Sequence, residues 1–326
     1  MTPETRAPTR ILAVADANDN GIALETAASL ADEHGATLDV MACVDPPHDL
    51  SILARLSGQK PEALIEEAVE PTRKTVRGRL DQIAGGREVD LSVSVGKAYL
   101  EIIRHVARSH CDFVVKAAEP LSGLDRFFFA STDQHLLRKC PCPVWLQTPH
   151  AQTHPRTVLV AVDLDLEGAA EPQTLRALNR RVMEAACMLP FAPDAEIVVL
   201  HAWDAIGEGM IWAFSNGNDM RIAADRYVNE VLAARQDAMD RFLTQVRQEI
   251  GPTSRLIACL ERGSPEKVIH DKAKAIGADV LVMGTVARTG LQGVIIGNTA
   301  ENIINSLDCS VLAVKPDGFA SPLLET

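Results

Sequence analysis

A glycine-containing segment near the end of the chain has the residue types of a phosphate-binding loop. Gly284 follows a short apolar run at 280–283, and Gly297, Asn298 and Thr299 begin a stretch of helical period. Glycine lets a backbone approach an anion closely, and the first turn of a helix presents unpaired N–H groups and the positive end of its dipole. The spacing therefore predicts that phosphate binds between the end of a strand and the start of a helix.

Two further features of this segment have both a chemical and a structural interpretation. Arg288 in the intervening loop would add a charge-assisted contact to phosphate, or it is a solvated loop arginine. Asn298 and Glu301 have the spacing of a capping box, which would explain the helix start without any ligand. Ser264 and Pro265 likewise predict a helix N-terminus, with Ser264 as the cap and proline in the first turn.

For the other residues that could do chemistry, we favour structural interpretations. Cys140-Pro141-Cys142 has fewer ligands than a zinc site needs, so we interpret it as a loop leading into a buried strand. His201 ends an apolar run and is interpreted as structural. No arrangement of nucleophile, base and orienting group is visible in the sequence. We therefore predict that the protein acts by binding and not by catalysis.

The chain contains an internal repeat, which shows how these residues are positioned. Residues 96–146 align with residues 263–313 without a gap, with nine identities in 51 positions and a matching apolar pattern. The repeat extends to the start of each half, where 11–16 matches 158–163. We predict two domains, 1–148 and 155–326, joined by a polar linker at 147–155 that contains two prolines.

The first half has lost the phosphate motif. Ala117, Pro120 and Ala130 stand at the positions of Gly284, Ala287 and Gly297, so every glycine is missing and a proline has removed a backbone N–H. The phenylalanines at 127–129 add apolar volume beside the former motif, either packed on the sheet or exposed as an apolar pocket. Phosphate is therefore predicted to bind only in the second half.

Apolar runs alternate with stretches of helical period in both halves, which is typical of a doubly wound α/β fold. Runs that are apolar on both faces predict buried parallel strands, and ligands in such folds lie at the carboxyl ends of the strands where the winding reverses. The predicted strands are 11–15, 38–44, 91–95, 113–115 and 144–146 in the first half, and 158–162, 197–202, 256–260, 280–283 and 311–314 in the second. Helices are predicted at 21–34, 61–83, 221–250, 265–276 and 300–307.

An insertion distinguishes the second half. Its apolar residues follow the second strand, and the polar segment 216–219 is predicted to break the chain before a long helix. The insertion would form either a lid over the ligand or a cover packed on the neighbouring domain. The apolar residues are Trp203, Met210, Ile211, Trp212 and Phe214.

Composition excludes several classes of partner. The net charge is −12, which argues against nucleic acid or an anionic membrane. No apolar run is long enough to span a bilayer, and residues 1–10 have no apolar signal core, so a cytoplasmic location is expected. The seven cysteines are expected to be reduced thiols.

The motif resembles one from a known family. Gly284-x-x-Ala287, nine residues and then Gly297-Asn298-Thr299 looks like the nucleotide motif of the universal stress proteins, which is Gly-x-x-Gly, nine residues and Gly-Ser/Thr. Val-Asp at 162–163, Gly-x-Pro at 263–265 and Cys-Ser-Val-Leu-Ala-Val at 309–314 are also similar to the family. The resemblance covers almost the whole chain, once per half, and 297–301 and 136–145 look most like tandem proteins of the E type.

The resemblance implies two tandem Rossmann-like domains of the adenine nucleotide alpha hydrolase-like type, each a five-stranded parallel sheet with helices on both faces. It implies a cytoplasmic stress-response protein that binds ATP or a related adenine nucleotide in the C-terminal domain, with no metal beyond nucleotide-bound Mg²⁺. Some family members hydrolyse ATP slowly, so an enzymatic activity stays open. Carried over, Asp163 and Ala202 would face the nucleoside, and Gly284, Gly297, Asn298 and Thr299 would face the phosphates. Met283, Ala287 and Arg288 complete the predicted nucleotide site.

Two departures and two alternatives accompany this interpretation. Ala287 replaces the second motif glycine, and Asn298 stands where Ser or Thr is usual. One alternative is a nucleotide-independent scaffold, and the other is a carrier of an apolar or lipid-like ligand that uses 127–129 or the insertion around Trp212. The two halves are expected to pair within one chain through 144–146 and 311–314, with a homodimer as a further option.

Overall fold

The computed structural model describes residues 7–83, 89–119, 131–214, 218–250, 255–285 and 297–324. The first half contains β1 (Arg10–Ala15), α1 (Ile22–His34), β2 (Thr37–Val44), α2 (Leu50–Ser57), α3 (Pro61–Ile83), β3 (Leu91–Val95), α4 (Ala98–Ser109), β4 (Phe113–Ala117), α5 (Ser131–Lys139) and β5 (Val144–Gln147). The second contains β6 (Thr157–Ala161), α6 (Pro172–Cys187), β7 (Glu196–Trp203), α7 (Glu208–Phe214), α8 (Asn218–Glu249), β8 (Leu256–Arg262), α9 (Pro265–Ile276), β9 (Val280–Gly284), α10 (Asn298–Ser306) and β10 (Ser310–Val314).

Each half is a five-stranded parallel sheet, as predicted. The strand order is β3-β2-β1-β4-β5 in the first half and β8-β7-β6-β9-β10 in the second, so the two halves have the same winding. The winding reverses between β1 and β4 and between β6 and β9, which places the ligand crevices at the carboxyl ends of these strands. Among the described residues, no helix is both long and apolar enough to cross a lipid bilayer.

The two halves form one continuous ten-stranded sheet, because β5 and β10 pair in antiparallel fashion. The register places Trp145 opposite Leu312, and these two residues are equivalent positions of the repeat. A pseudo-two-fold axis therefore passes between them. This confirms the predicted pairing of the two halves through their closing strands.

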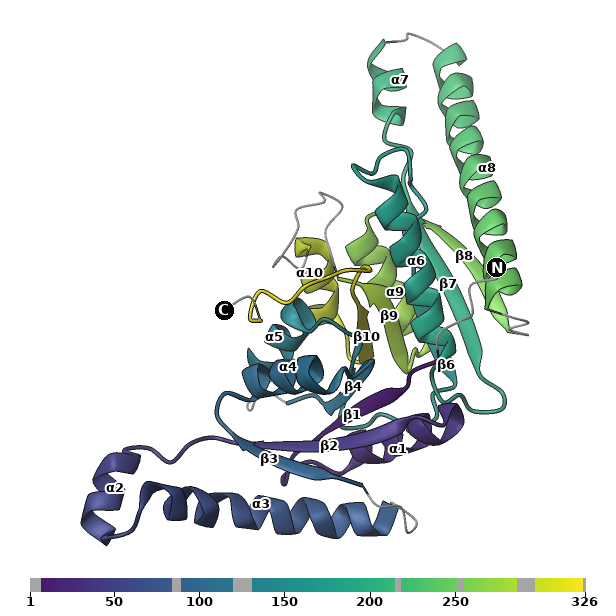
Figure 1. The fold of residues 1–326 in the computed structure, drawn as a ribbon. Helices are drawn as coiled ribbons and strands as arrows, with labels where there is room; N and C mark the ends of the chain where they lie inside the picture. The colour runs from purple at the N-terminus through teal and green to yellow at the C-terminus, as the bar shows by residue number, and fades with distance from the viewer. Residues whose placement is uncertain are drawn as a thin grey trace.

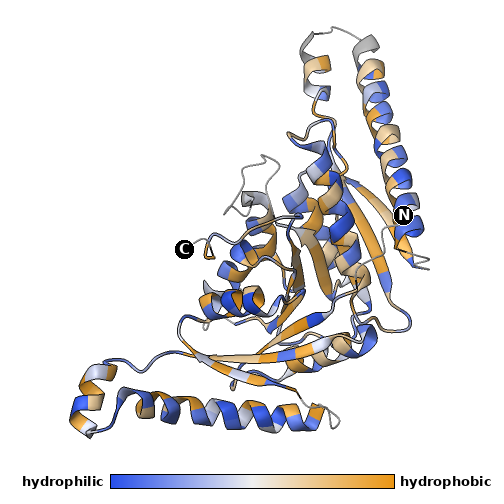
Figure 2. Ribbon diagram, viewed as in Figure 1, coloured by the Kyte–Doolittle hydropathy of each residue, from blue (hydrophilic) through white to orange (hydrophobic). Residues whose placement is uncertain are grey.

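Helices cover both faces of the sheet (Figure 1). One apolar layer contains residues of α1, α3, α6 and α8, and the other contains residues of α4, α5, α9 and α10. Both layers include residues of both halves, and the strands between them are hydrophobic along most of their length (Figure 2). The apolar runs of the sequence form strands because both of their faces are buried.

Polar contacts also join the two halves. Lys315, which follows β10, donates through Nζ to the carbonyl of Leu137 in α5 and to the hydroxyl of Thr285. Only 3% of Lys315 is exposed, and this burial lowers the pKa of its amine to about 7. Arg138 of α5 forms an ion pair with Glu301 of α10. The interface between the halves thus combines a strand pair with a buried amine.

Two sequence predictions about connecting segments are wrong. Gln147 was assigned to the linker, but it is the last residue of β5 and its buried amide bonds to the hydroxyl of Thr26 at 2.8 Å. Asn218 and Asp219 were expected to precede the long helix, whereas α8 begins at Asn218. Polar residues are tolerated there because the first turn of a helix has backbone N–H groups without intrahelical partners.

Candidate functional site

The carboxyl ends of three neighbouring strands bring predicted site residues together. Ala161 of β6 lies opposite Leu200 of β7 on one side and opposite Met283 of β9 on the other. Asp163, Ala202 and Gly284 follow these positions and therefore lie at the same edge of the sheet. This edge is the point where the winding of the second half reverses.

The start of α10 is held against the end of β9. The amide of Gly297 donates to the carbonyl of Thr285 at 3.3 Å, and Thr285 directly follows β9. Gly297 is the N-cap of α10, with φ −57° and ψ 137°. The first N–H groups of α10, including that of Thr299, therefore begin close to the carboxyl end of β9.

The predicted capping box at Asn298 is wrong. Gly297 caps α10, so Asn298 is the first helical residue, and the Glu301 carboxylate pairs with Arg138 of the first half. An ion pair with the other half thus takes the place of the local contact. Ser264 occupies the N-cap position of α9 as predicted, but its side chain forms no capping hydrogen bond, and Pro265 opens the helix.

Asp163 forms a turn at the end of β6. Its Oδ1 accepts the amide of Asp165 at 3.1 Å, and its own amide and carbonyl both bond to the side chain of Asn179 on α6. The first half forms a similar turn, in which Asp16 Oδ1 accepts the amide of Asn18 at 2.8 Å. The presence of an aspartate at this position in both halves is therefore explained in part by the hydrogen bond that its side chain makes to the backbone of the turn.

His201 supports the same turn from β7. It is 2% exposed, and its Nδ1 lies 3.2 Å from the carbonyl of Val162 and 3.3 Å from the amide of Leu164. Burial lowers the pKa of this histidine. His201 is therefore a neutral structural group that fixes the residues on either side of Asp163, which agrees with its interpretation from sequence.

Gly284 has a packing function in addition to its place at the site. A Cβ atom at this position would lie 2.7 Å from Cδ2 of Leu178 on α6. Real Cβ atoms do not tolerate such a contact, so any larger residue at this position would require the Leu178 side chain to shift. Met283 is 6% exposed and belongs to the apolar layer on the opposite face.

Several predicted residues lie outside the part of the chain that the structure describes. These are Ala287, Arg288, the side chain of Asn298 and the phenylalanines at 127–129. Thr299 is exposed in the first turn of α10, and Ala202 is partly buried on β7.

The first half has a hollow at the equivalent edge of its sheet. Its volume is about 460 Å³. Three carboxylates line it, those of Asp16, Asp45 and Glu119, together with Lys97 and the aromatic pair Tyr99 and His135, whose ring centres are 4.1 Å apart. Excess negative charge disfavours a phosphate group here.

A buried ion pair lies behind this hollow. Lys116 Nζ lies 2.9 Å from both Asp133 Oδ1 and Glu119 Oε1, and Asp133 Oδ2 accepts the amide of Glu119 at 2.8 Å. Burial alone would lower the pKa of Lys116, but the two carboxylates together raise it above its usual value. The repeat places Met283 and Ala300 at the positions of Lys116 and Asp133. Sequence reasoning missed this ion pair because its two residues lie in separate elements.

The insertion of the second half is an arm and not a cover. Trp203 is the last residue of β7, and the other four apolar residues belong to α7. Helix α7 packs on α8 and lies at the far end of the molecule from the first half (Figure 1). Met210 and Trp212 remain 63% and 48% exposed. The prediction of a cover on the neighbouring domain is therefore wrong.

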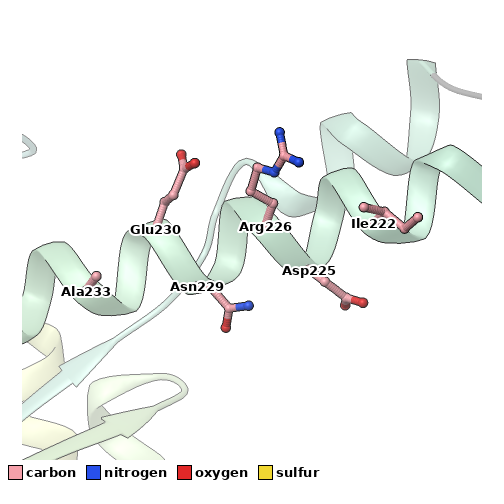
Figure 3. Close-up of a pocket in the computed structure, with 6 residues that line it drawn as sticks. All are labelled: Ile222, Asp225, Arg226, Asn229, Glu230 and Ala233. Atoms are coloured by element: carbon pink, nitrogen blue, oxygen red, sulfur yellow. The ribbon is translucent and has the colours of Figure 1, made fainter.

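A second hollow lies on α8, away from the strand ends (Figure 3). Its lining residues all come from one helix, at spacings of three and four positions, so it is one face of a helix. The residues are Ile222, Asp225, Arg226, Asn229, Glu230 and Ala233.

Comparison with known proteins now defines the class of molecule. The profile of the Universal stress protein family matches residues 8–147 and again residues 155–315. The chain belongs to the universal stress protein family.

Among individual proteins, the chain is similar to universal stress protein E. It is 28% identical to the Universal stress protein E homolog of Haemophilus influenzae, over 92% of this chain and 94% of that protein. It is 32% identical to Universal stress protein E of Escherichia coli, over 68% of this chain and 66% of that protein, slightly less than two thirds of the relative's length.

Solved structures show the same fold. A protein of unknown function from Pseudomonas aeruginosa PAO1 matches with a TM-score of 0.63 and 24% identity, over 96% of this chain and 94% of that one. A universal stress protein from Archaeoglobus fulgidus matches with a TM-score of 0.58 and 17% identity, over 94% of this chain and 98% of that one.

Proposed function

We propose that the second half binds ATP or a related adenine nucleotide, one molecule per chain, and that the protein acts in a stress response by binding this nucleotide. The observation that carries the proposal is the arrangement at the carboxyl ends of β6, β7 and β9. There Asp163, Ala202 and Gly284 lie at one edge, and Gly297 begins a helix beside them.

Each part of this edge suits one part of a nucleotide. Asp163 and Ala202 would face the nucleoside, and Gly284, Gly297 and Thr299 would face the phosphates. Helix N-termini bind phosphate because their first N–H groups are not used within the helix. Bound Mg²⁺ would enter with the nucleotide.

The first half differs from the second at the equivalent edge, which supports nucleotide binding in the second half alone. Its equivalent edge carries three carboxylates against one lysine, and it lacks every motif glycine. The Lys116–Asp133 ion pair occupies the positions that Met283 and Ala300 hold in the second half.

A matched pair of threonine variants tests the proposal on the full-length chain. Thr299 and Thr132 occupy the same position of the repeat, in the first turns of α10 and α5. Thr299→Val should weaken ATP binding in titration calorimetry about tenfold or more, since a hydrogen bond to a charged phosphate is lost. Thr132→Val should leave affinity and stoichiometry unchanged. Loss of binding in Thr132→Val alone would contradict the proposal.

Two further variants test the loop itself. Gly297 has a φ that any residue adopts, so Gly297→Val should fold and yet fail to bind ATP, because its side chain fills the approach to the helix start. Ala287→Gly restores the second motif glycine and should leave affinity equal or raise it. Unfolding of Gly297→Val, measured by circular dichroism, would instead identify a purely structural glycine.

A further inference from the structure

Three side chains of different chemistry meet at the amino ends of the first-half strands, on the edge of the sheet opposite the hollow. Asp39 comes from β2, His105 from α4, and Cys111 from the segment before β4. One donor atom from each lies within 4.8 Å of the other two, and His105 Nε2 is 3.2 Å from Asp39 Oδ2.

A carboxylate, an imidazole and a thiol form a ligand set typical of zinc. In a tetrahedral zinc site with bonds of about 2.0–2.3 Å, neighbouring ligand atoms are separated by about 3.3–3.7 Å. Because the donor atoms lie within 4.8 Å of one another, they would need to close by about 1.5 Å at most. We propose that Asp39, His105 and Cys111 bind a divalent transition-metal ion of the zinc class, with a fourth position open to water.

The surroundings leave the required atoms available. Arg10 Nη1 lies 2.7 Å from Asp39 Oδ1, so Oδ2 is the oxygen that faces His105. The side chains of Asp39 and His105 are 12% and 16% exposed, which leaves a route for an ion. The neighbouring Asp112 is used differently, because its Oδ2 accepts the amides of Thr9 and Arg10.

The repeat provides an internal control. Leu12 lies opposite Asp39 in the first half, and the equivalent Leu159 lies opposite Val198 in the second. Lys272 and Ala278 stand at the positions of His105 and Cys111. The same fold therefore forms without any of the three donors, and their joint occurrence in one half points to a ligand.

The alternative is an ion pair between Arg10, Asp39 and His105 with no metal. Such a pair does not use Cys111, so the cysteine distinguishes the two cases. Metal-free, reduced, full-length protein would be titrated with Zn²⁺ by calorimetry. Co²⁺ would serve as a spectroscopic probe, because a cysteine thiolate bound to Co²⁺ absorbs in the near ultraviolet.

The expected result is one Zn²⁺ per chain and a thiolate–Co²⁺ absorption. Cys111→Ala and His105→Lys copy the residues of the second half, so they should fold, and each should weaken Zn²⁺ binding about tenfold or more. As controls, Cys309→Ala and His270→Gln remove one cysteine and one histidine of the second half, and both variants should bind Zn²⁺ as the unmodified chain does.

Three outcomes would overturn the proposal. The unmodified chain could bind no Zn²⁺, or Cys111→Ala could retain both the affinity and the Co²⁺ spectrum. An ion lost in Cys142→Ala but kept in Cys111→Ala would place the metal on Cys140 and Cys142 instead. If Cys111→Ala failed to fold, His105→Lys and the spectrum of the unmodified chain would decide.

Discussion

Several residues shared by the two halves form the same backbone contacts in each. Asp112 accepts the amides of Thr9 and Arg10, and Asp279 accepts those of Arg156 and Thr157. Gly96 and Gly263 have φ of 148° and 145°, a conformation that disfavours other residues. Identity within the repeat therefore marks the requirements of the fold, and positions that differ between the halves are better candidates for chemistry.

Lys116 and Asp133 are one such difference, and they give a prediction about stability. Lys116→Met or Asp133→Ala alone leaves a buried charge without its partner and should lower the free energy of unfolding by about 3–5 kcal/mol. The double variant copies Met283 and Ala300 of the second half, so its loss should be clearly smaller than the sum. Urea denaturation of the four proteins measures this, and additive losses would contradict the coupling.

Lys315 predicts a dependence of stability on pH. Its pKa is about 7 in the folded protein and 10.5 by its usual value, so between these pH values the unfolded chain binds a proton that the folded chain lacks. The contribution of Lys315 to the free energy of unfolding therefore increases as the pH rises from 7 towards 10.5. The increase is at most about 1.4 kcal/mol per pH unit.

Lys315→Met removes this titration. The unfolding free energy of the unmodified chain minus that of the variant should increase by about 1–2 kcal/mol between pH 7 and pH 8.5. Because the variant retains the cysteines and tyrosines, their titrations cancel in the comparison. A difference that stays constant over this range would mean that the amine is charged in the folded protein.

At the scale of elements, the contact between β9 and α6 depends on Gly284. Gly284→Ala should lower stability by about 1–3 kcal/mol, because its methyl group would meet Leu178. Leu178→Ala makes room for that methyl group, so the double variant should lose less than the sum of the single changes. Thermal unfolding measures the cycle. If Gly284→Ala weakens ATP binding without loss of stability, the glycine acts at the phosphates and not in packing.

Each half carries a helical arm. Both follow the second strand of their half, as α2 and α3 after β2 and as α7 and α8 after β7 (Figure 1). Each leaves apolar residues exposed, such as Leu56 at 76% and Met210 at 63%. Among the described residues, neither apolar layer includes one from α2 or α7, so the sequences of these two helices could change without disturbing the strand order.

At the scale of the whole molecule, the pairing of β5 with β10 makes one sheet from two. Val311 is fully buried and lies opposite Leu146. Val311→Asp should separate the halves, because an unpaired charge cannot be buried without a large cost. The expected results are a loss of several kcal/mol and protease cleavage within 148–155.

Val311→Ala is the control for this change. It leaves a cavity without a charge, so it should lower stability but keep the linker protected from protease. A resistant linker in Val311→Asp would mean that contacts such as those of Lys315 and Arg138 hold the halves together without the strand pair.

The sequence by itself predicted the repeat, the five strands of each half and the pairing of the closing strands. Buried parallel strands are apolar on both faces, so their positions can be read locally, and 91–95 was predicted with its observed bounds. Asp163, Gly284 and Gly297 were also placed correctly at one edge, because strand ends and helix starts follow from the order of elements. Helix α7 was missed because a seven-residue helix has too little periodicity to detect.

Only the tertiary structure decided which distant side chains meet. Asp39, His105 and Cys111 lie on a strand, a helix and a loop, and no spacing in the sequence joins them. The same holds for Lys116 with Asp133, for Glu301 with Arg138 and for Leu178 above Gly284. Local periodicity encodes which face of an element is buried, but the contacts across layers depend on how all the elements pack together.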